Sequence, residues 1–218
     1  KLNSNYANAY LNLGRILGDL GRLKDAELSY RKAIKLNPDF VDAYYNLGRI
    51  LCDLGRLKDA ESSTRKAIEL NPNFTFAHYN LGNILCTLGK LKDAEFSYRK
   101  AIQLKPDLAI AHSNLGNVLR DLGNLKDAEI SIRNAIKLNP DYAIAHSNLG
   151  NVLRDLDNLK DAEISIRNAI KLNPDYAIAH LNLGILLRNL GNLKDAEFSF
   201  RKAIKLKPDF ASAYNNLG

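Results

Sequence analysis

The sequence predicts an all-α fold in which pairs of antiparallel helices follow one another along the chain. A unit of 34 residues recurs six times, and the apolar residues inside each unit follow the 3–4 spacing of amphipathic helices. No stretch shows the strict alternation that predicts a strand. Apolar residues make up 46% of the chain and charged residues 25%, which excludes a disordered chain. No run of about 18 apolar residues occurs, so we expect no membrane span.

The repeats define the predicted domain organisation, a single array over residues 1–218. Aligned on a recurring Leu-Gly pair, the full repeats are 7–40, 41–74, 75–108, 109–142, 143–176 and 177–210. Residues 1–6 and 211–218 are expected to be parts of two further copies, so the chain is expected to be cut from a longer array. Positions are numbered 1 to 34 within each repeat below.

Each repeat is expected to hold two helices. The first should begin at the Asn-Pro or Lys-Pro step that closes the preceding repeat, with Asn as N-cap where it occurs, as at Asn139. In the fourth repeat this predicts a helix from Pro106 to about Leu122, ended by Gly123. The second helix should begin near Asn124.

Small residues explain how the helices can pack. Glycine occupies position 8 in every copy, up to the terminal Gly218, and alanine occupies positions 20 and 27. Glycine at position 8 and alanine at position 20 let the two helices of one repeat approach closely. Alanine at position 27 lets the first helix of the next repeat dock. One helix pair cannot bury its apolar face alone, so the repeats must stack.

This pattern resembles the tetratricopeptide repeat (TPR) family. In the first repeat the matching residues are Leu13, Gly14, Ala26, Tyr30, Ala33 and Pro38. The resemblance implies a right-handed superhelix whose concave face is lined by the first helices and binds peptide segments. Position 4 departs from the family, because it holds Tyr or His where a larger aromatic residue is usual.

A row of asparagines is the main candidate site. Positions 2, 5, 6, 9, 12 and 13 form the stripe of the first helix that faces away from the core, and the resemblance places this stripe on the concave face. Position 6 is asparagine in every copy: Asn12, Asn46, Asn80, Asn114, Asn148, Asn182 and Asn216. An amide can pair with both N–H and C=O of an extended peptide. The row is similar to that of the TPR superhelix of O-linked N-acetylglucosamine transferases. The alternative is that these amides bond neighbouring repeats or water.

Two neighbouring rows add charge and further amides to the predicted groove. Position 9 contributes Arg15, Arg49, Asn83, Asn117 and Asn151, and position 12 contributes Arg120, Arg154 and Arg188. The arginines favour acidic or phosphorylated segments, unless the aspartates at position 13 neutralise them. The paired Lys or Arg residues with which some TPR domains bind chaperone C-termini are absent from positions 2 and 6.

Other kinds of site are not predicted. His78, His112, His146 and His180 occupy one position of successive repeats, and helices packed about 8–10 Å apart cannot bring them to one metal ion. Cys52 and Cys86 are expected to be free thiols for the same reason. Repeats 109–142 and 143–176 differ only at Gly123 and Asp157, whereas a catalytic site needs unique converging residues. We therefore expect no enzyme activity and no cofactor, and the dispersed charge predicts no nucleic-acid partner.

The predicted function is a non-enzymatic scaffold that binds a protein or peptide in the concave groove, in an expected cytoplasmic compartment. One alternative is a substrate-docking arm of a larger glycosyl- or sulfotransferase. Another is end-to-end self-association through uncapped ends of the array. The near-identity of two repeats also fits a consensus-like designed array, although irregularities such as Cys52, Thr64 and Asp157 favour a natural sequence.

Overall fold

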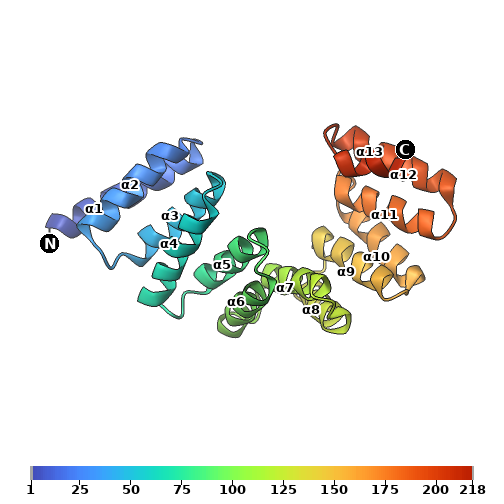
Figure 1. Cartoon of the computed structure of the whole chain (residues 1–218), viewed down its shortest axis with the longest axis horizontal. Helices are drawn as coiled ribbons and strands as arrows, with labels where there is room; N and C mark the ends of the chain where they lie inside the picture. The colour runs from blue at the N-terminus through green and yellow to red at the C-terminus, as the bar shows by residue number, and fades with distance from the viewer. Residues whose placement is uncertain (1, 218) are drawn as a thin grey trace. The chain divides into compact units, whose positions relative to one another are not determined.

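The computed structural model describes residues 2–217, which form thirteen helices and no strand (Figure 1). Gly218, the terminal copy of position 8, lies outside the described residues. The first helices of the repeats are α1 (Leu2–Asp19), α3 (Val41–Asp53), α5 (Thr75–Thr87), α7 (Ala109–Asp121), α9 (Ala143–Asp155), α11 (Ala177–Asn189) and α13 (Ala211–Leu217). The second helices are α2 (Leu23–Leu36), α4 (Leu57–Leu70), α6 (Leu91–Leu104), α8 (Leu125–Leu138), α10 (Leu159–Leu172) and α12 (Leu193–Leu206). The predicted all-α fold is confirmed.

The helices group into two compact units, residues 1–106 and residues 107–218. In the N-terminal unit α1 packs on α2, α3 on α4 and α5 on α6, while α1 contacts α3 and α3 contacts α5. In the C-terminal unit α7 packs on α8, α9 on α10 and α11 on α12, with α7, α9, α11 and α13 in contact in sequence. The first helices of each unit therefore stack directly on one another.

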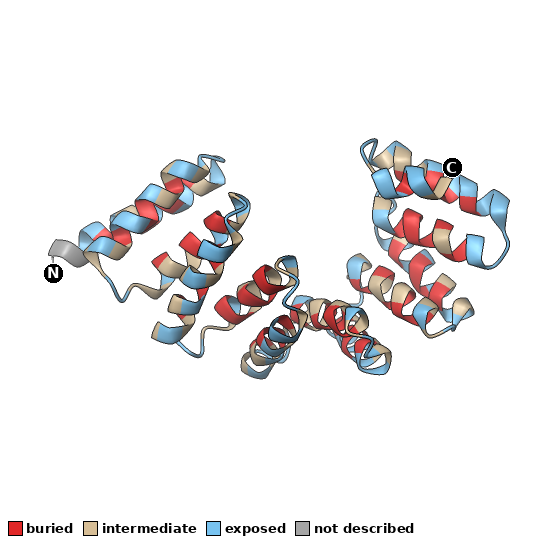
Figure 2. Cartoon of the chain, in the orientation of Figure 1, coloured by how far each residue is buried: buried red, intermediate tan, exposed pale blue. Residues whose placement is uncertain are grey.

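Each helix buries one stripe of side chains and exposes the rest (Figure 2). In the N-terminal unit one core cluster contains Leu47, Ile50 and Leu51 of α3 together with Tyr30 of α2 and Ile84 of α5. Neighbouring helix pairs thus share one core, as expected when a single pair cannot bury its apolar face.

The glycine at position 8 faces the side chain at position 24 of its own repeat. A Cβ built on Gly14 would lie 2.6 Å from Cε1 of Tyr30, and one built on Gly184 would lie 2.5 Å from Cε1 of Phe200. The backbone carbonyl of Ala128 at position 20 lies 3.1 Å from the equivalent point on Gly116. These close approaches explain the glycine at position 8, and they place the backbone of position 20 against the first helix of the same repeat.

The predicted start of the first helices is wrong. α7 begins at Ala109, three residues after Pro106, and the residue at its N-cap is Leu108. Asn139, expected as the N-cap of α9, instead caps the C-terminus of α8, and Tyr142 precedes α9. The physical reason is that a residue before proline is pushed into an extended conformation, which ends the preceding helix.

The second helices begin where the sequence predicts, directly after position 16. In α10 and α12 the side chains of Asn158 and Asn192 accept N-cap hydrogen bonds from the backbone N–H of Asp161 and Asp195, each at 3.4 Å. In the N-terminal unit position 16 is basic, and Lys90 pairs instead with Glu61 of the preceding repeat at 2.8 Å. Position 16 thus supplies a helix cap at Asn158 and Asn192 and a tie between repeats at Lys90, whereas Asn124 makes no side-chain cap and Arg22 pairs with Asp25 of the helix that it precedes.

No helix among residues 2–217 combines the length and the apolar character that crossing a membrane requires.

Candidate functional site

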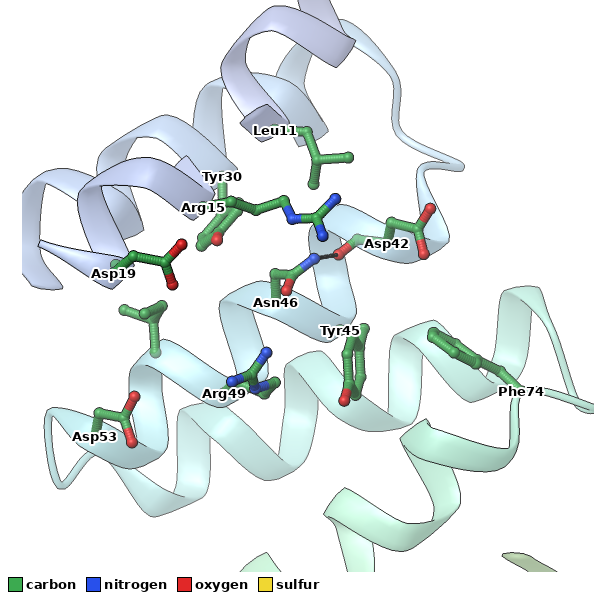
Figure 3. Close-up of a pocket in the computed structure, with 12 residues that line it drawn as sticks. Leu11, Arg15, Asp19, Tyr30, Asp42, Tyr45, Asn46, Arg49, Asp53 and Phe74 are labelled. Atoms are coloured by element: carbon green, nitrogen blue, oxygen red, sulfur yellow. Dashed lines mark hydrogen bonds between the residues drawn. The ribbon is translucent and has the colours of Figure 1, made fainter. Parts of the chain in front are cut away.

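A cavity of about 380 Å³ lies between α1 and α3 in the N-terminal unit (Figure 3). Its lining combines both signs of charge, an amide and aromatic rings. The side chains come mainly from the two first helices, with one contribution from α2 and one from the residue that precedes α5: Leu11, Arg15, Asp19, Tyr30, Asp42, Tyr45, Asn46, Arg49, Ile50, Asp53 and Phe74.

The helical register explains why these residues meet. Asp42, Tyr45, Asn46, Arg49 and Asp53 are spaced three or four apart along α3 and therefore share one face of the helix. α1 presents Leu11, Arg15 and Asp19 at the equivalent register. The cavity is thus built from the predicted stripe, and it brings together Arg15, Asn46 and Arg49 of the predicted site residues.

The two arginines of the cavity carry exposed charge. Within the described part of the chain, neither Arg15 nor Arg49 forms an ion pair with Asp19, Asp42 or Asp53, although all five line the cavity. In Figure 3 the guanidinium group of Arg15 lies next to Asn46, and Arg49 lies further along α3. Guanidinium groups that are exposed and unpaired can replace their water contacts with hydrogen bonds to acidic groups of a bound segment.

Two tyrosines and a phenylalanine form the aromatic part of the lining. Burial raises the pKa of Tyr30, opposed by the nearby charges of Arg49 and Arg15, and burial also raises the pKa of Tyr45, opposed by Arg49. Both phenols therefore keep their protons at neutral pH and can donate hydrogen bonds. The ring of Tyr45 lies 4.9 Å from that of Phe74, centroid to centroid.

The sequence-based prediction missed Tyr30 and Phe74 as site residues. Tyr30 belongs to a second helix, but Gly14 leaves room for its ring to reach across α1 into the cavity. An aromatic residue at position 24 opposite a glycine at position 8 is the signal that could have identified it. Phe74 at position 34 offered no comparable signal.

The predicted asparagines of the N-terminal unit differ in their surroundings. Asn46 Nδ2 donates to the backbone carbonyl of Asp42 at 2.8 Å (dashed in Figure 3), and Asn83 Oδ1 accepts from the hydroxyl of Tyr98 at 2.7 Å. Asn12 is exposed and does not line the cavity. The buried Nδ2 of Asn80 has no hydrogen-bond partner among the described residues.

Two position-6 asparagines of the C-terminal unit tie first helices together. Asn148 Nδ2 donates to Ser113 Oγ at 3.1 Å, and Asn182 Nδ2 donates to Ser147 Oγ at 3.0 Å. Both serines are fully buried, and each belongs to position 5 of the preceding repeat. Asn114 is half-buried on α7. Bonding between neighbouring repeats was the alternative to peptide binding, and the structure provides it for two amides of the row.

The predicted arginines of this unit share an aspartate. Arg120 Nε donates to Asp155 Oδ2 at 2.6 Å, and Arg154 contacts Asp155 Oδ1 at 3.2 Å. Asp155 stands at position 13, adjacent to Arg154 and in the repeat after Arg120. Arg154 also donates to Asn151 Oδ1 at 3.2 Å, while Asn117 is half-buried. Arg188 is exposed and has no ion pair among the described residues.

The histidines and cysteines are placed as packing residues. His78, His146 and His180 each lie 2.8–2.9 Å through Nε2 from a proline carbonyl six residues earlier, so Nε2 carries the proton and donates. His112 is half-buried at the same position. Residues 2–217 contain no cluster of ligands suited to a metal ion, and Cys52 and Cys86 are half-buried thiols that are not joined in a disulfide.

Comparison with family models finds TPR repeats along the chain. A model described as TPR repeat matches residues 14–55, 82–123 and 116–157, and models described as tetratricopeptide repeat match 41–74, 64–96, 143–176 and 177–210. A comparison with curated proteins gives no match.

Solved structures with the same repeat architecture cover most of this chain. YrrB, described as a TPR protein with an unusual peptide-binding site, is 26% identical over 85% of this chain and 96% of its own, with a TM-score of 0.64. PilW, a type IV pilus biogenesis factor, is 20% identical over 97% and 98%, with a TM-score of 0.87. PilF of Pseudomonas aeruginosa is 19% identical over 99% and 98%, with a TM-score of 0.82.

Proposed function

Because the chain belongs to the tetratricopeptide repeat family, we propose that it is a non-enzymatic scaffold that binds extended peptide segments along its first helices. The observation that carries the proposal is the cavity between α1 and α3, which is lined by the stripe that faces away from the core. The likeness to YrrB, a TPR protein with a peptide-binding site, supports it.

A peptide in this cavity would meet groups that recognise both its backbone and its side chains. Asn46 uses its amide N–H on the carbonyl of Asp42, which leaves its carbonyl oxygen to accept from a peptide N–H. Arg15 and Arg49 favour an acidic side chain, while Asp19 and Asp53 limit the number of acidic residues that the cavity tolerates. Tyr45 and Phe74 offer an aromatic surface for an apolar side chain.

The C-terminal unit would recognise charge more weakly. Asp155 already pairs with Arg120 and Arg154, so an acidic peptide must compete with a carboxylate for both guanidinium groups. Arg188 is exposed and is the arginine of this row that is free to pair with a peptide carboxylate. We therefore expect charge selectivity to come mainly from Arg15 and Arg49.

Peptide display against the whole chain, followed by affinity measurement, tests the proposal. Selected peptides should lose about tenfold or more in affinity with Arg15→Ala combined with Arg49→Ala, and a smaller factor with Asn46→Ala. Arg31→Ala is the matched control, because Arg31 is an exposed arginine on α2 whose ion pair is to Glu27 of the same helix. Asn12→Ala controls for loss of a position-6 amide outside the cavity.

Two outcomes would contradict the proposal. One is that no peptide is enriched on the wild-type chain. The other is that the cavity variants and the two controls bind the selected peptides equally well, which would place the binding surface elsewhere.

A further inference from the structure

Position 22 of the repeat places large apolar side chains in solvent on the second helices. It holds Leu28, Ser62, Phe96, Ile130, Ile164 and Phe198. Phe198 is 74% exposed, Phe96 71% and Ile164 59%. A single exposed apolar residue needs no explanation, but five in one register of six repeats indicate a surface with a use.

In the C-terminal unit two of these side chains form walls of grooves between successive second helices. The first groove lies between α8 and α10, has a volume of about 490 Å³, and is lined by Ile136, Leu149, Leu153 and Ile164 among others. The second lies between α10 and α12, has about 500 Å³, and repeats the same positions with Ile170, Leu183, Leu187 and Phe198. Each groove is large enough for an apolar side chain of a partner.

The charges that line each groove leave one lysine without a counter-ion. Arg133 and Arg167 pair with glutamates on their own helices, Glu129 and Glu163. On the opposite wall Asp161 and Asp195 accept hydrogen bonds from the amides of Asn158 and Asn192.

The remaining groups are a histidine and a lysine in each groove. His146 and His180 donate to proline carbonyls. Lys137 and Lys171 have no ion pair within the described part of the chain. A carboxylate of a partner would therefore find a free ammonium group beside an apolar floor.

The N-terminal unit contains the same kind of groove with the charge reversed. Between α4 and α6 the apolar floor is formed by Ile68, Leu81, Leu85 and Phe96, with a volume of about 410 Å³. The position of Lys137 and Lys171 is taken here by Glu69, which pairs with Lys66 at 2.7 Å. The groove between α4 and α6 therefore serves as an internal control, because it has a similar apolar floor but an acidic residue in place of the lysine.

We propose that the two grooves of the C-terminal unit bind an acidic protein segment. Large apolar side chains of that segment, such as Leu or Phe, enter the grooves beside Ile164 and Phe198, and neighbouring carboxylates pair with Lys137 and Lys171. This site is formed by the second helices α8, α10 and α12 over a floor from α9 and α11. It does not depend on the peptide-binding site formed by α1 and α3.

Two fluorescently labelled peptides of equal length test the site on the whole chain. Both carry leucines at the same places, with glutamates between them in one and lysines in the other. Fluorescence anisotropy at low salt should show the glutamate peptide binding about tenfold more tightly than the lysine peptide. Equal affinities, or a preference for the lysine peptide, would overturn the proposal.

Three sets of variants locate the site. Ile164→Ser with Phe198→Ser should reduce binding of the glutamate peptide about tenfold or more, because both apolar walls are lost. Serine occurs naturally in this register at Ser62, and both residues are exposed, so the helices should keep their structure, which circular dichroism checks. Phe96→Ser, in the groove that carries Glu69, should leave binding unchanged. Lys137→Glu with Lys171→Glu should reverse the preference between the two peptides.

The site is distinguished from the first-helix cavity by Arg15→Ala combined with Arg49→Ala. These changes should leave the glutamate peptide bound. Loss of binding in that variant, or an equal loss with Phe96→Ser and with Ile164→Ser/Phe198→Ser, would contradict binding in the outer grooves of the C-terminal unit.

Discussion

Asn182 Nδ2 donates a hydrogen bond to Ser147 Oγ over 3.0 Å, and the bond joins α11 to α9. Ser147 is fully buried and Asn182 is 7% exposed, so water cannot readily replace either partner. The same bond recurs between Asn148 and Ser113. Where position 5 of the preceding repeat is Tyr45, the buried Nδ2 of Asn80 lacks a partner within residues 2–217. The asparagine at position 6 therefore ties two repeats together where position 5 of the preceding repeat is a serine.

Ser147→Ala should destabilise the chain by about 1–3 kcal/mol, because it leaves the buried Nδ2 of Asn182 without an acceptor. Urea unfolding followed by circular dichroism measures the loss. Asn12→Ala changes an exposed amide at the same repeat position and should cost less than about 0.5 kcal/mol. A loss for Ser147→Ala no larger than that of Asn12→Ala would show that the bond contributes nothing.

Gly184→Ala should also destabilise the chain, by about 1–3 kcal/mol, because its Cβ would lie 2.5 Å from Cε1 of the buried Phe200. Gly18→Ala is the matched control on a first helix, since its nearest neighbour would be Cδ1 of Ile50 at 3.2 Å, the end of a flexible side chain. There the helix propensity of alanine offsets the contact. Thermal unfolding should separate the two variants, and equal melting temperatures would refute the packing argument.

Asp157 takes the place that glycine holds in the other repeats, with φ at 60° where the glycines have φ between 72° and 81°. A Cβ crowds the backbone in a left-handed conformation and destabilises it. Asp157→Gly should therefore stabilise the chain by roughly 0.5–1 kcal/mol. Gly123→Asp should destabilise it by a similar amount, and the two repeats are otherwise identical in sequence. Urea unfolding of both variants checks the sign, and changes in the same direction would contradict it.

The repeat period was enough to predict the helix pairs, their order and the close packing of positions 8 and 20. Register along each first helix likewise indicated that Arg15 of α1 and Asn46 and Arg49 of α3 lie on the side that faces away from the core. Periodicity does not tell which side chains bond across helices, because that depends on residues about one repeat apart. For this reason the pairing of Arg120 with Asp155, 35 residues away, could be predicted only as an alternative to the pairing of Arg120 with an acidic partner.

Local rules also failed where two of them compete. Asparagine before proline satisfies the N-cap preference, yet proline forces that residue into an extended conformation. The second effect prevails at Asn173, where φ is −139° and the side chain accepts a hydrogen bond from the N–H of Asp175. Tyr30 was missed because its ring reaches the cavity from a second helix, past Gly14, and helical register within one helix cannot reveal this.

Glu61 should make stability depend on pH. Its carboxylate accepts hydrogen bonds from Lys90 of the next repeat and from Arg65 of its own helix. The hydrogen bond from Lys90 is the largest influence and lowers the pKa of Glu61, partial burial opposes it, and Arg65 adds to the lowering. Because the pKa is lower in the folded state, the native chain favours the ionised form. The stabilisation is present above the unfolded-state pKa and is lost as pH falls through the folded-state pKa.

Glu61→Gln should therefore lower the free energy of unfolding by at most about 1 kcal/mol at neutral pH, and by progressively less as the solution becomes more acidic. Urea unfolding at a series of pH values measures the difference between variant and wild type. Glu197→Gln is the control, because Glu197 is exposed and its ion pair is to Arg201 of the same helix, so no tie between repeats is lost. High salt should reduce the effect of Glu61→Gln, since Lys90 is solvent-exposed. A difference that grows on acidification would mean that Glu61 is not held as the ion in the folded chain.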